Sequence, residues 1–354
     1  MHIIFVSASI GGGGAERVVA ELAAQMSEQG HRVEIVTIGS QKKDYHLPAD
    51  ISVINCAQKG KIPGLSFLGR VCRLRKVVKE RQPDACISFN TTVNIYAALA
   101  CADMGRKLIL AERNDPVSYP SSKVYRFLRD RLYRGKFRYA FQTEEAKQFF
   151  SKKIQNNSAV IFNPINSAMP AVYEGQRSKR FVMAGRLEPQ KNLIMAIDAF
   201  SMLKESHPEY VLEIYGEGMQ KAQIEEYIIA QALSPWVKLM GRSNRLYEDI
   251  LDATAFVLSS DFEGMSNSML EAMALGIPTI STDYPSGGAR AVIRNGENGL
   301  LIPVGDTQAL HAAMKRVIDE PELAQCLSAN GEKLRKELSV ASITEQWLTF
   351  VSQE

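Results

Sequence analysis

At 354 residues, with 45% hydrophobic and 23% charged residues, the chain has the length of two domains and the composition of a soluble globular protein. Its apolar runs fall short of the roughly 18 residues that indicate a transmembrane helix, and its first residues predict a strand rather than a signal peptide. Five scattered cysteines and five histidines have no metal-ligand spacing, so we expect a reducing compartment and no metal site.

The net charge of +3 is the sum of two halves of opposite sign. Residues 1–170 carry 25 Lys and Arg against 14 Asp and Glu, a charge of +11. The remaining 17 and 25 give residues 171–354 a charge of −8. A basic half predicts an anionic partner, and nucleic acid, an anionic membrane or a diphosphate-bearing substrate would each fit.

The first half alternates strands with helices. It opens with a strand at 3–8, a glycine loop at 9–14 and a helix at 15–29. This opening is a poor dinucleotide fingerprint, because Glu16 takes the place of the third glycine and no acid ends the next strand. Further strands are predicted at 32–38, 51–55, 85–89, 108–111 and 139–143, and further helices at 66–81, 122–138 and 144–153.

Two of these predicted helices are basic. In 66–81, Arg70, Arg73 and Lys76 recur every three residues beside an apolar side. In 122–138, clustered Lys and Arg accompany an apolar stripe, which consists of Val124, Phe127, Leu128 and Leu132. The second pattern is typical of a helix that lies on a membrane surface, although an ordinary helix with a solvated basic face would show it too.

The second half repeats the alternation after an irregular stretch at 166–179, which predicts a linker. Strands are predicted at 181–184, 210–215, 237–240, 255–259 and 279–282, and helices at 192–204, 219–232, 245–253, 266–275, 307–319, 322–338 and 343–352. Two such runs predict an α/β protein with two doubly wound parallel sheets.

Charged residues in the second half lie where strands end and helices begin. Arg186 and Lys191 straddle a helix start, where two cations and the helix dipole can hold a diphosphate. Glu263 and Glu271, with seven residues between them, flank the start of the helix at 266–275. The free amides at that start suit a phosphate, so the two carboxylates can face different parts of one long polar ligand.

The stretch from Ser259 to Asp283 resembles the Glu–seven residues–Glu motif of retaining GT-B glycosyltransferases of family 4. The flanking residues also fit the family, namely Gly264, Asn267, Ala272, Gly276, Pro278 and Asp283. Residues 13–17, Gly-Gly-Ala-Glu-Arg, resemble the family's first loop, and 185–192 resemble its diphosphate clamp.

The resemblance implies a role for each matching residue. Glu263 would lie by the donor sugar and Glu271 would bind the ribose, while Arg186, Lys191 and the amides of residues 266–268 would stabilise the leaving diphosphate. The implied catalytic residues are Glu263, Arg186 and Lys191. The implied nucleotide-binding residues are Glu271, Gly13, Gly14, Gly216, Gly241, Arg242, Ser266, Asn267 and Ser268. No Walker or DxD motif is evident, so we expect no metal. The resemblance implies no cofactor and a nucleotide-sugar substrate, which we expect to be a UDP-sugar.

The acceptor site is less defined. Many family members have a His after the fifth strand, where this chain has Glu112 and Arg113. Arg113 could contact the donor sugar or the acceptor phosphate, and a structural Glu112–Arg113 pair is an equal alternative. Arg70, Arg73 and Lys76 could hold the acceptor's diphosphate.

The resemblance implies two Rossmann-like domains that face a cleft, with 1–165 binding the acceptor and 180–339 binding the nucleotide sugar. It also implies that the last helix, within 340–354, crosses back to the first domain, where Trp347 and Phe350 would anchor it.

The expected protein is a cytoplasmic enzyme, peripheral on the inner face of the cytoplasmic membrane. It would transfer a hexose or N-acetylhexosamine from a UDP-sugar to a polyprenyl-diphosphate-linked or other lipid-linked glycan, with retention. The alternatives are a soluble small acceptor and a non-catalytic sugar-nucleotide-binding protein. We expect no nucleic-acid partner, because the chain has no recognised module for it and its basic residues interleave with apolar ones.

Overall fold

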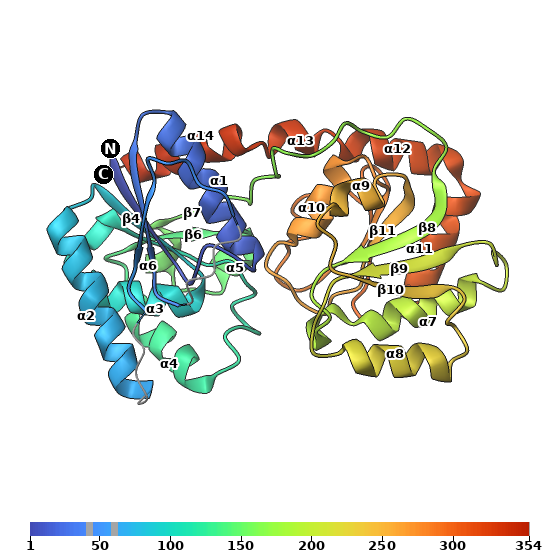
Figure 1. Ribbon diagram of the computed structural model, residues 1–354, viewed down its shortest axis with the longest axis horizontal. Coiled ribbons are helices and arrows are strands. Elements are labelled where there is room, and N and C mark those ends of the chain that lie inside the picture. The colour runs from blue at the N-terminus through green and yellow to red at the C-terminus, as the bar shows by residue number, and fades with distance from the viewer. Residues whose placement is uncertain (40–44, 58–62, 354) are drawn as a thin grey trace. The chain divides into compact units, whose positions relative to one another are not determined.

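The computed structural model describes residues 1–39, 45–57 and 63–353 (Figure 1). The chain divides into two compact units, of which one is Met1–Pro164 with Val340–Glu354 and the other is Ile165–Ser339. Each unit contains one sheet in which every strand pair is parallel, with helices against it. The predicted α/β class with two Rossmann-like sheets is confirmed.

The first unit has a seven-stranded sheet in the order β3-β2-β1-β4-β5-β6-β7. Its strands are β1 His2–Ser7, β2 Arg32–Thr37, β3 Ser52–Asn55, β4 Ala85–Phe89, β5 Leu108–Ala111, β6 Arg138–Phe141 and β7 Ser158–Val160. Its helices are α1 Gly14–Glu28, α2 Pro63–Arg81, α3 Thr91–Ala100, α4 Lys123–Leu132, α5 Glu144–Gln148, α6 Lys152–Gln155 and α14 Val340–Ser352. The central strands are buried on both faces, which explains their continuous apolar runs.

The last helix, α14, packs beside α1 in this unit (Figure 1). Trp347 is fully buried, with its ring centroid 5.6 Å from that of Phe89, and Phe350 is 6% exposed. Arg138 of β6 donates to the carbonyls of Phe350, Val351 and Gln353, three acceptors in and after the last turn of α14. A buried cation therefore satisfies the free carbonyls of this helix end. The predicted return of the helix and its two anchors are confirmed.

The second unit has a six-stranded sheet in the order β10-β9-β8-β11-β12-β13. Its strands are β8 Ser178–Ala184, β9 Val211–Tyr215, β10 Val237–Gly241, β11 Ala253–Leu258, β12 Thr279–Thr282 and β13 Leu300–Ile302. Its helices are α7 Leu193–Leu203, α8 Lys221–Ala230, α9 Leu246–Ile250, α10 Asn267–Ala274, α11 Thr307–Asp319, α12 Pro321–Gly331 and α13 Leu334–Glu337. The strand order reverses beside β8, and ligands of such sheets bind at the carboxyl ends of the strands at this point.

Several predicted helices differ from the structure in their bounds, and three of them are divided or clearly shorter. The helix expected at 322–338 is two helices, α12 and α13, because the chain turns next to Gly331, where a Cβ atom would lie 3.1 Å from the Met273 carbonyl oxygen. The helix expected at 144–153 is also two short helices, α5 and α6. The helix expected at 122–138 ends at Leu132, because Arg138 begins strand β6.

Candidate active site

Three loops follow neighbouring strands of the second sheet, and we call them the donor loops: 185–187 after β8, 216–218 after β9 and 241–243 at the end of β10. A Cβ atom on Gly216, whose φ is +142°, would lie 1.8 Å from the carbonyl oxygen of Gly185. Only glycine fits this close approach of two backbones. The loops contain three predicted nucleotide-binding residues, which are Gly216, Gly241 and Arg242.

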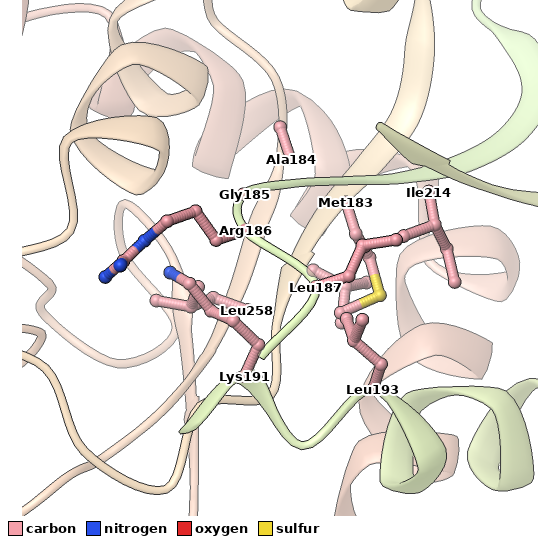
Figure 2. Close-up of a pocket in the computed structure, with 10 residues that line it drawn as sticks. Met183, Ala184, Gly185, Arg186, Leu187, Lys191, Leu193, Ile214 and Leu258 are labelled. Carbon is pink, nitrogen blue, oxygen red and sulfur yellow. The ribbon is translucent and has the colours of Figure 1, made fainter. Parts of the chain in front are cut away.

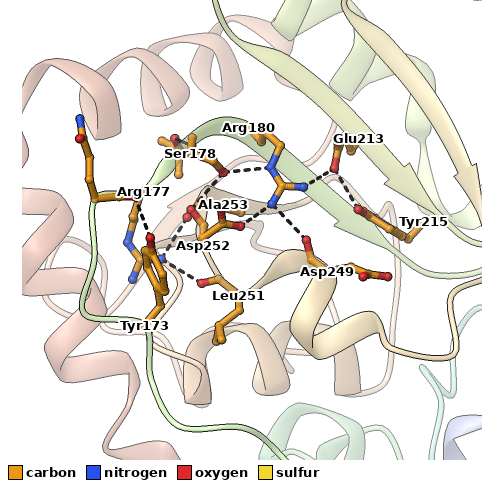
Figure 3. A network of polar contacts seen from close by, with 12 residues as sticks. Tyr173, Arg177, Ser178, Arg180, Glu213, Tyr215, Asp249, Leu251, Asp252 and Ala253 are labelled. Atoms are coloured by element: carbon orange, nitrogen blue, oxygen red, sulfur yellow. Dashed lines mark hydrogen bonds and ion pairs between the residues drawn. The ribbon is translucent and has the colours of Figure 1, made fainter.

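A network of polar side chains connects two of the donor loops (Figure 3). Arg180 of β8 donates to the Glu213 carboxylate at 2.6 Å and to the Asp249 carbonyl at 3.1 Å. The hydroxyl of Tyr215, just before one donor loop, donates to Glu213 at 2.9 Å, and burial together with this carboxylate raises the pKa of Tyr215 to about 12. Ser243, in another donor loop, donates to the Asp249 carboxylate at 2.5 Å. The sequence analysis missed this network, although an acid inside the apolar strand β9 was a usable signal.

The two predicted diphosphate-binding cations lie at one pocket (Figure 2). Figure 2 shows the nitrogens of Arg186 and Lys191 on the same side, away from the apolar wall that includes Met183 and Leu193. Arg186 is exposed, and the structure gives its guanidinium no partner among the described residues. A cation without a protein partner beside a glycine backbone suits an anionic ligand such as a diphosphate.

Lys191 and Glu263, 72 positions apart, form a largely buried ion pair. The Lys191 amine lies 2.6 Å from the Glu263 carboxylate, and the two side chains are 14% and 12% exposed. The Ser260 hydroxyl donates to the same carboxylate oxygen at 3.0 Å. The structure therefore brings two of the predicted catalytic residues together, and it adds Ser260, which the sequence analysis did not single out.

Hydrogen bonds between the segments 190–192 and 259–262 hold this pair in place. Ser259 donates to the carbonyls of Lys191 and Asn192 at 2.8 and 3.0 Å. The Gln190 side chain donates to the Phe262 carbonyl at 2.7 Å. The two segments follow β8 and β11, which are neighbours in the sheet, so the contact arises from strand order.

Helix α10 begins directly after the Glu263 loop. The Ser266 hydroxyl accepts from the amide of Met269, which caps the helix, and it lies 3.2 Å from the Ser268 hydroxyl. Glu271 is 8% exposed in the second turn of the helix. The predicted residues Ser266, Asn267, Ser268 and Glu271 thus belong to the same helix start.

Gly13 and Gly14 belong to the first unit, whereas the other predicted nucleotide-binding residues belong to the second. Gly13 is the residue before α1, and the Tyr45 hydroxyl donates to its carbonyl at 3.0 Å. A Cβ atom on Gly13 would lie 2.3 Å from a carboxylate oxygen of Glu16. The side chain of Glu16, which takes the place of the third glycine of a dinucleotide fingerprint, therefore lies against the glycine loop.

Glu112 and Arg113 are both buried, and their side chains go to different partners. The Glu112 carboxylate accepts from Thr91 at 2.7 Å and Asn94 at 3.0 Å, and burial raises its pKa. The guanidinium of Arg113 lies 4.7 Å from the ring centroid of Phe89, and burial lowers its pKa to about 9. Arg113 also donates to the backbone carbonyl of residue 161 at 3.0 Å. The two side chains thus have separate hydrogen-bond partners, although the charge of Glu112 acts on Arg113 and opposes the lowering of its pKa by burial.

The predicted acceptor-binding residues of α2 differ in their contacts and exposure. Arg73 donates to the Ala57 carbonyl at 3.2 Å, and Lys76 lies 3.7 Å from Glu80, one helical turn away. Arg70 is half-buried. Arg73 and Lys76 remain exposed, so they are the part of the stripe that a ligand could reach.

Helix α4 exposes part of its predicted apolar stripe and buries one of its arginines, while Leu132 of the same stripe packs against the core of the first unit. Val124 and Phe127 of its predicted apolar stripe are 66% and 68% exposed, whereas Arg129 is 2% exposed. Arg129 donates to the carbonyls of Pro116 and Tyr119, and Arg126 likewise donates to carbonyls of this loop. Arg126 and Arg129 are therefore bound to backbone carbonyls, whereas Lys123 and Arg131 are exposed, so the helix has a solvated basic face only in part.

Comparison with known proteins gives matches in both halves. Residues 13–156 match the family of glycosyl transferase 4-like domains, and residues 169–334 match the family of glycosyl transferases group 1. An N-acetyl-D-galactosaminyltransferase of Campylobacter jejuni that acts on an undecaprenol-diphosphate-linked glycan is 25% identical, over 100% of this chain and 99% of the relative. The lipopolysaccharide 1,6-galactosyltransferase of Salmonella typhimurium is 26% identical over 90% of each chain.

Solved structures agree on the fold. The Anabaena protein HepE, in a complex with UDP and glucose, superposes with a TM-score of 0.84 at 17% identity, over 99% of both chains. The apo lipopolysaccharide outer core galactosyltransferase WaaB superposes with a TM-score of 0.76 at 20% identity, again over 99% of both chains. With a 4-like domain in its first half and a group 1 domain in its second, the chain belongs to the family 4 glycosyltransferases of the GT-B fold.

Proposed function

We propose that the chain is a retaining, metal-independent hexosyltransferase that moves a hexose or N-acetylhexosamine from a UDP-sugar to a lipid-linked glycan in surface-polysaccharide assembly. The observation that carries the proposal is the largely buried Lys191–Glu263 pair beside Arg186, which has no partner in the part of the chain that the structure describes. The acceptor class is supported by the Campylobacter and Salmonella relatives, whose substrates are a lipid-linked glycan and lipopolysaccharide.

The chemistry follows from charge development in the donor. The leaving nucleoside diphosphate gains negative charge as the glycosidic bond breaks, and the sugar gains positive charge at its anomeric carbon. Arg186, Lys191 and the first amides of α10 stabilise the leaving group, which is electrostatic catalysis by fixed groups. Glu263 faces the sugar, and its contacts with Lys191 and Ser260 hold it in one orientation. The leaving phosphate takes the acceptor's proton as the acceptor attacks from the same face.

The test is a panel of UDP-sugars with a polyprenyl-diphosphate-linked glycan, in buffer with EDTA, read by mass spectrometry and by NMR of the new linkage. We expect one UDP-sugar to give a product with the anomeric configuration of the donor. Transfer only to soluble sugars would favour the soluble-acceptor alternative. UDP-sugar binding without any transfer would favour a binding protein, and an inverted product or activity abolished by EDTA would contradict the retaining, metal-independent reaction.

The acceptor of this reaction is a membrane component, and α4 offers a surface for peripheral association with an anionic leaflet on the cytoplasmic side. Within the described residues, no helix is both long and apolar enough to cross a bilayer. Val124 and Phe127 stand exposed on α4, with Lys123 and Arg131 also exposed on this helix. Burying an apolar side chain of this size contributes about 1.5–3 kcal/mol, and each cation near anionic lipid contributes about 1 kcal/mol.

Co-sedimentation with anionic liposomes tests this surface. Phe127→Glu should release the protein, whereas Ile229→Glu should not, because Ile229 of α8 is equally exposed at 69% but belongs to the acidic half. Replacing Arg126 or Arg129 would be a poor test, since both hold backbone carbonyls. Equal binding of the two variants and the parent would exclude α4 as the membrane surface.

A further inference from the structure

A turn at residues 283–288, directly after β12, contacts the backbone of the loop that contains Glu263. The Ser286 hydroxyl donates to the Glu263 carbonyl at 2.5 Å and lies 3.2 Å from the Gly264 carbonyl. Ser286 is 3% exposed, so water does not compete for these contacts. One buried hydroxyl thus holds two successive carbonyls at the position of the candidate catalytic carboxylate.

Gly288 provides a second, steric contact in the same place. A Cβ atom on Gly288 would lie 2.0 Å from the Gly264 carbonyl oxygen and 2.9 Å from the Tyr284 hydroxyl. The Tyr284 ring is fully buried, so the turn cannot easily yield to an added methyl group. The backbone of Gly264 therefore rests directly on the turn, and its place depends on the absence of a side chain at Gly288.

These contacts act on the Glu263 backbone, while Lys191 and Ser260 hold the carboxylate at the other end of the side chain. A carboxylate fixed at both ends has little freedom to leave the geometry that its reaction needs. We propose that the 283–288 turn is a positioning element for Glu263, in which Ser286 and Gly288 set the distance between this carboxylate and the start of α10. The inference rests on the proposed function, because it takes Glu263 as the group that faces the donor sugar.

Two substitutions in the turn test the proposal. For each variant, kcat reports the rate of transfer, and the chemical labelling of Lys191 reports the position of Glu263. Ser286→Ala and Gly288→Ala should each lower kcat by about 10- to 100-fold, because displacements of about 1 Å have such effects, while UDP affinity changes less than about threefold. Ser286→Thr keeps the hydroxyl and should restore most of the rate. Ser281→Ala is the matched control, since Ser281 is also fully buried but donates to the Thr282 carbonyl instead.

The position of Glu263 can be followed without any activity. If Glu263 moves, the Lys191 amine loses its partner and should react faster with acetic anhydride than in the parent, relative to the exposed Lys238, as read by peptide mass spectrometry. Unchanged Lys191 labelling with unchanged kcat in both variants would overturn the proposal. The proposal would also be overturned if the fall in kcat came with a similar fold-loss of UDP affinity and with a lower melting temperature. That result would mean that the turn supports only the fold. If the parent protein transfers no sugar, the proposed function is refuted. The labelling of Lys191 would still show whether the turn holds Glu263 in place.

Discussion

Replacing Glu263 by Gln separates the two roles that its ion pair with Lys191 combines. Glutamine keeps the size of the side chain and one acceptor oxygen for Ser260, but it removes the charge that pairs with Lys191 at 2.6 Å. We expect kcat to fall about 100- to 1,000-fold, the usual cost of removing one preorganised electrostatic group. We expect UDP affinity to stay the same or to increase, because the amine of Lys191 becomes free for the diphosphate.

The expected size of the affinity change follows from the pair itself. Two unit charges at 2.6 Å attract by about 6 kcal/mol at an effective dielectric constant of about 20. Desolvation of both ions offsets most of this attraction, since it costs several kcal/mol per ion. A remainder of about 1 kcal/mol, by which the charge of Glu263 weakens the attraction of Lys191 for a phosphate, corresponds to a gain of about three- to tenfold in UDP affinity when that charge is removed.

Calorimetric titration with UDP and initial rates of transfer, measured on the same preparations, provide the test. Glu209→Gln is the matched control, because Glu209 forms an exposed pair with Lys179 at 3.3 Å, and such pairs contribute at most about 1 kcal/mol. A tenfold or greater loss of UDP affinity in Glu263→Gln would mean that Glu263 supports nucleotide binding. A parent-like transfer rate would refute its assignment to the donor sugar.

Four further substitutions have expected outcomes. Glu271→Ala should weaken UDP binding at least tenfold, because each hydrogen bond from a ribose hydroxyl to a carboxylate contributes about 1.5–3 kcal/mol; calorimetry with parent-like affinity would remove Glu271 from the site. Arg186→Ala should lower turnover about 100-fold or more, and initial rates equal to those of the parent would contradict this. Gly216→Ala should abolish UDP binding and lower the melting temperature in circular dichroism, since its Cβ would lie 1.8 Å from the Gly185 carbonyl oxygen; an unchanged melting curve would speak against that packing. Arg138→Met should lower the free energy of unfolding by about 2–4 kcal/mol, because three carbonyls at the end of α14 lose a charged donor, and urea denaturation with an unchanged midpoint would show that α14 is held by its apolar face alone.

The order of strands explains why the sequence predicts the residues of the site but not their contacts. Lys191 and Glu263 each follow a buried strand, and apolar runs reveal such strands. The ion pair between them depends on β8 and β11 being neighbours in the sheet, as does the contact of Ser259 with the loop after β8. No local pattern encodes which strands are neighbours, so the resemblance to a family was needed to place these residues at one site.

The turn at 283–288 shows a second limit of the sequence. Its residues belong to a stretch that reads as a loop with proline and glycines, which predicts a turn and nothing more. That Ser286 faces two particular carbonyls, and that Gly288 touches Gly264, follow from the packing of β12 beside β11. Residues that act on backbone atoms of another segment carry no periodic or charge signal, so they emerge only from the structure.

The arginines of the first unit show the same limit for charge. Its charge of +11 predicted an anionic partner, yet Arg126, Arg129 and Arg138 all donate to backbone carbonyls. Buried carbonyls need donors, and a guanidinium with five N–H groups can satisfy several at once. These arginines keep their charge, but their N–H groups are engaged and are less available for direct contact with lipid phosphates. On α4, Arg126 and Arg129 turn inward while Val124 and Phe127 of the apolar stripe are exposed, so membrane affinity should depend more on the Phe127 ring than on salt concentration.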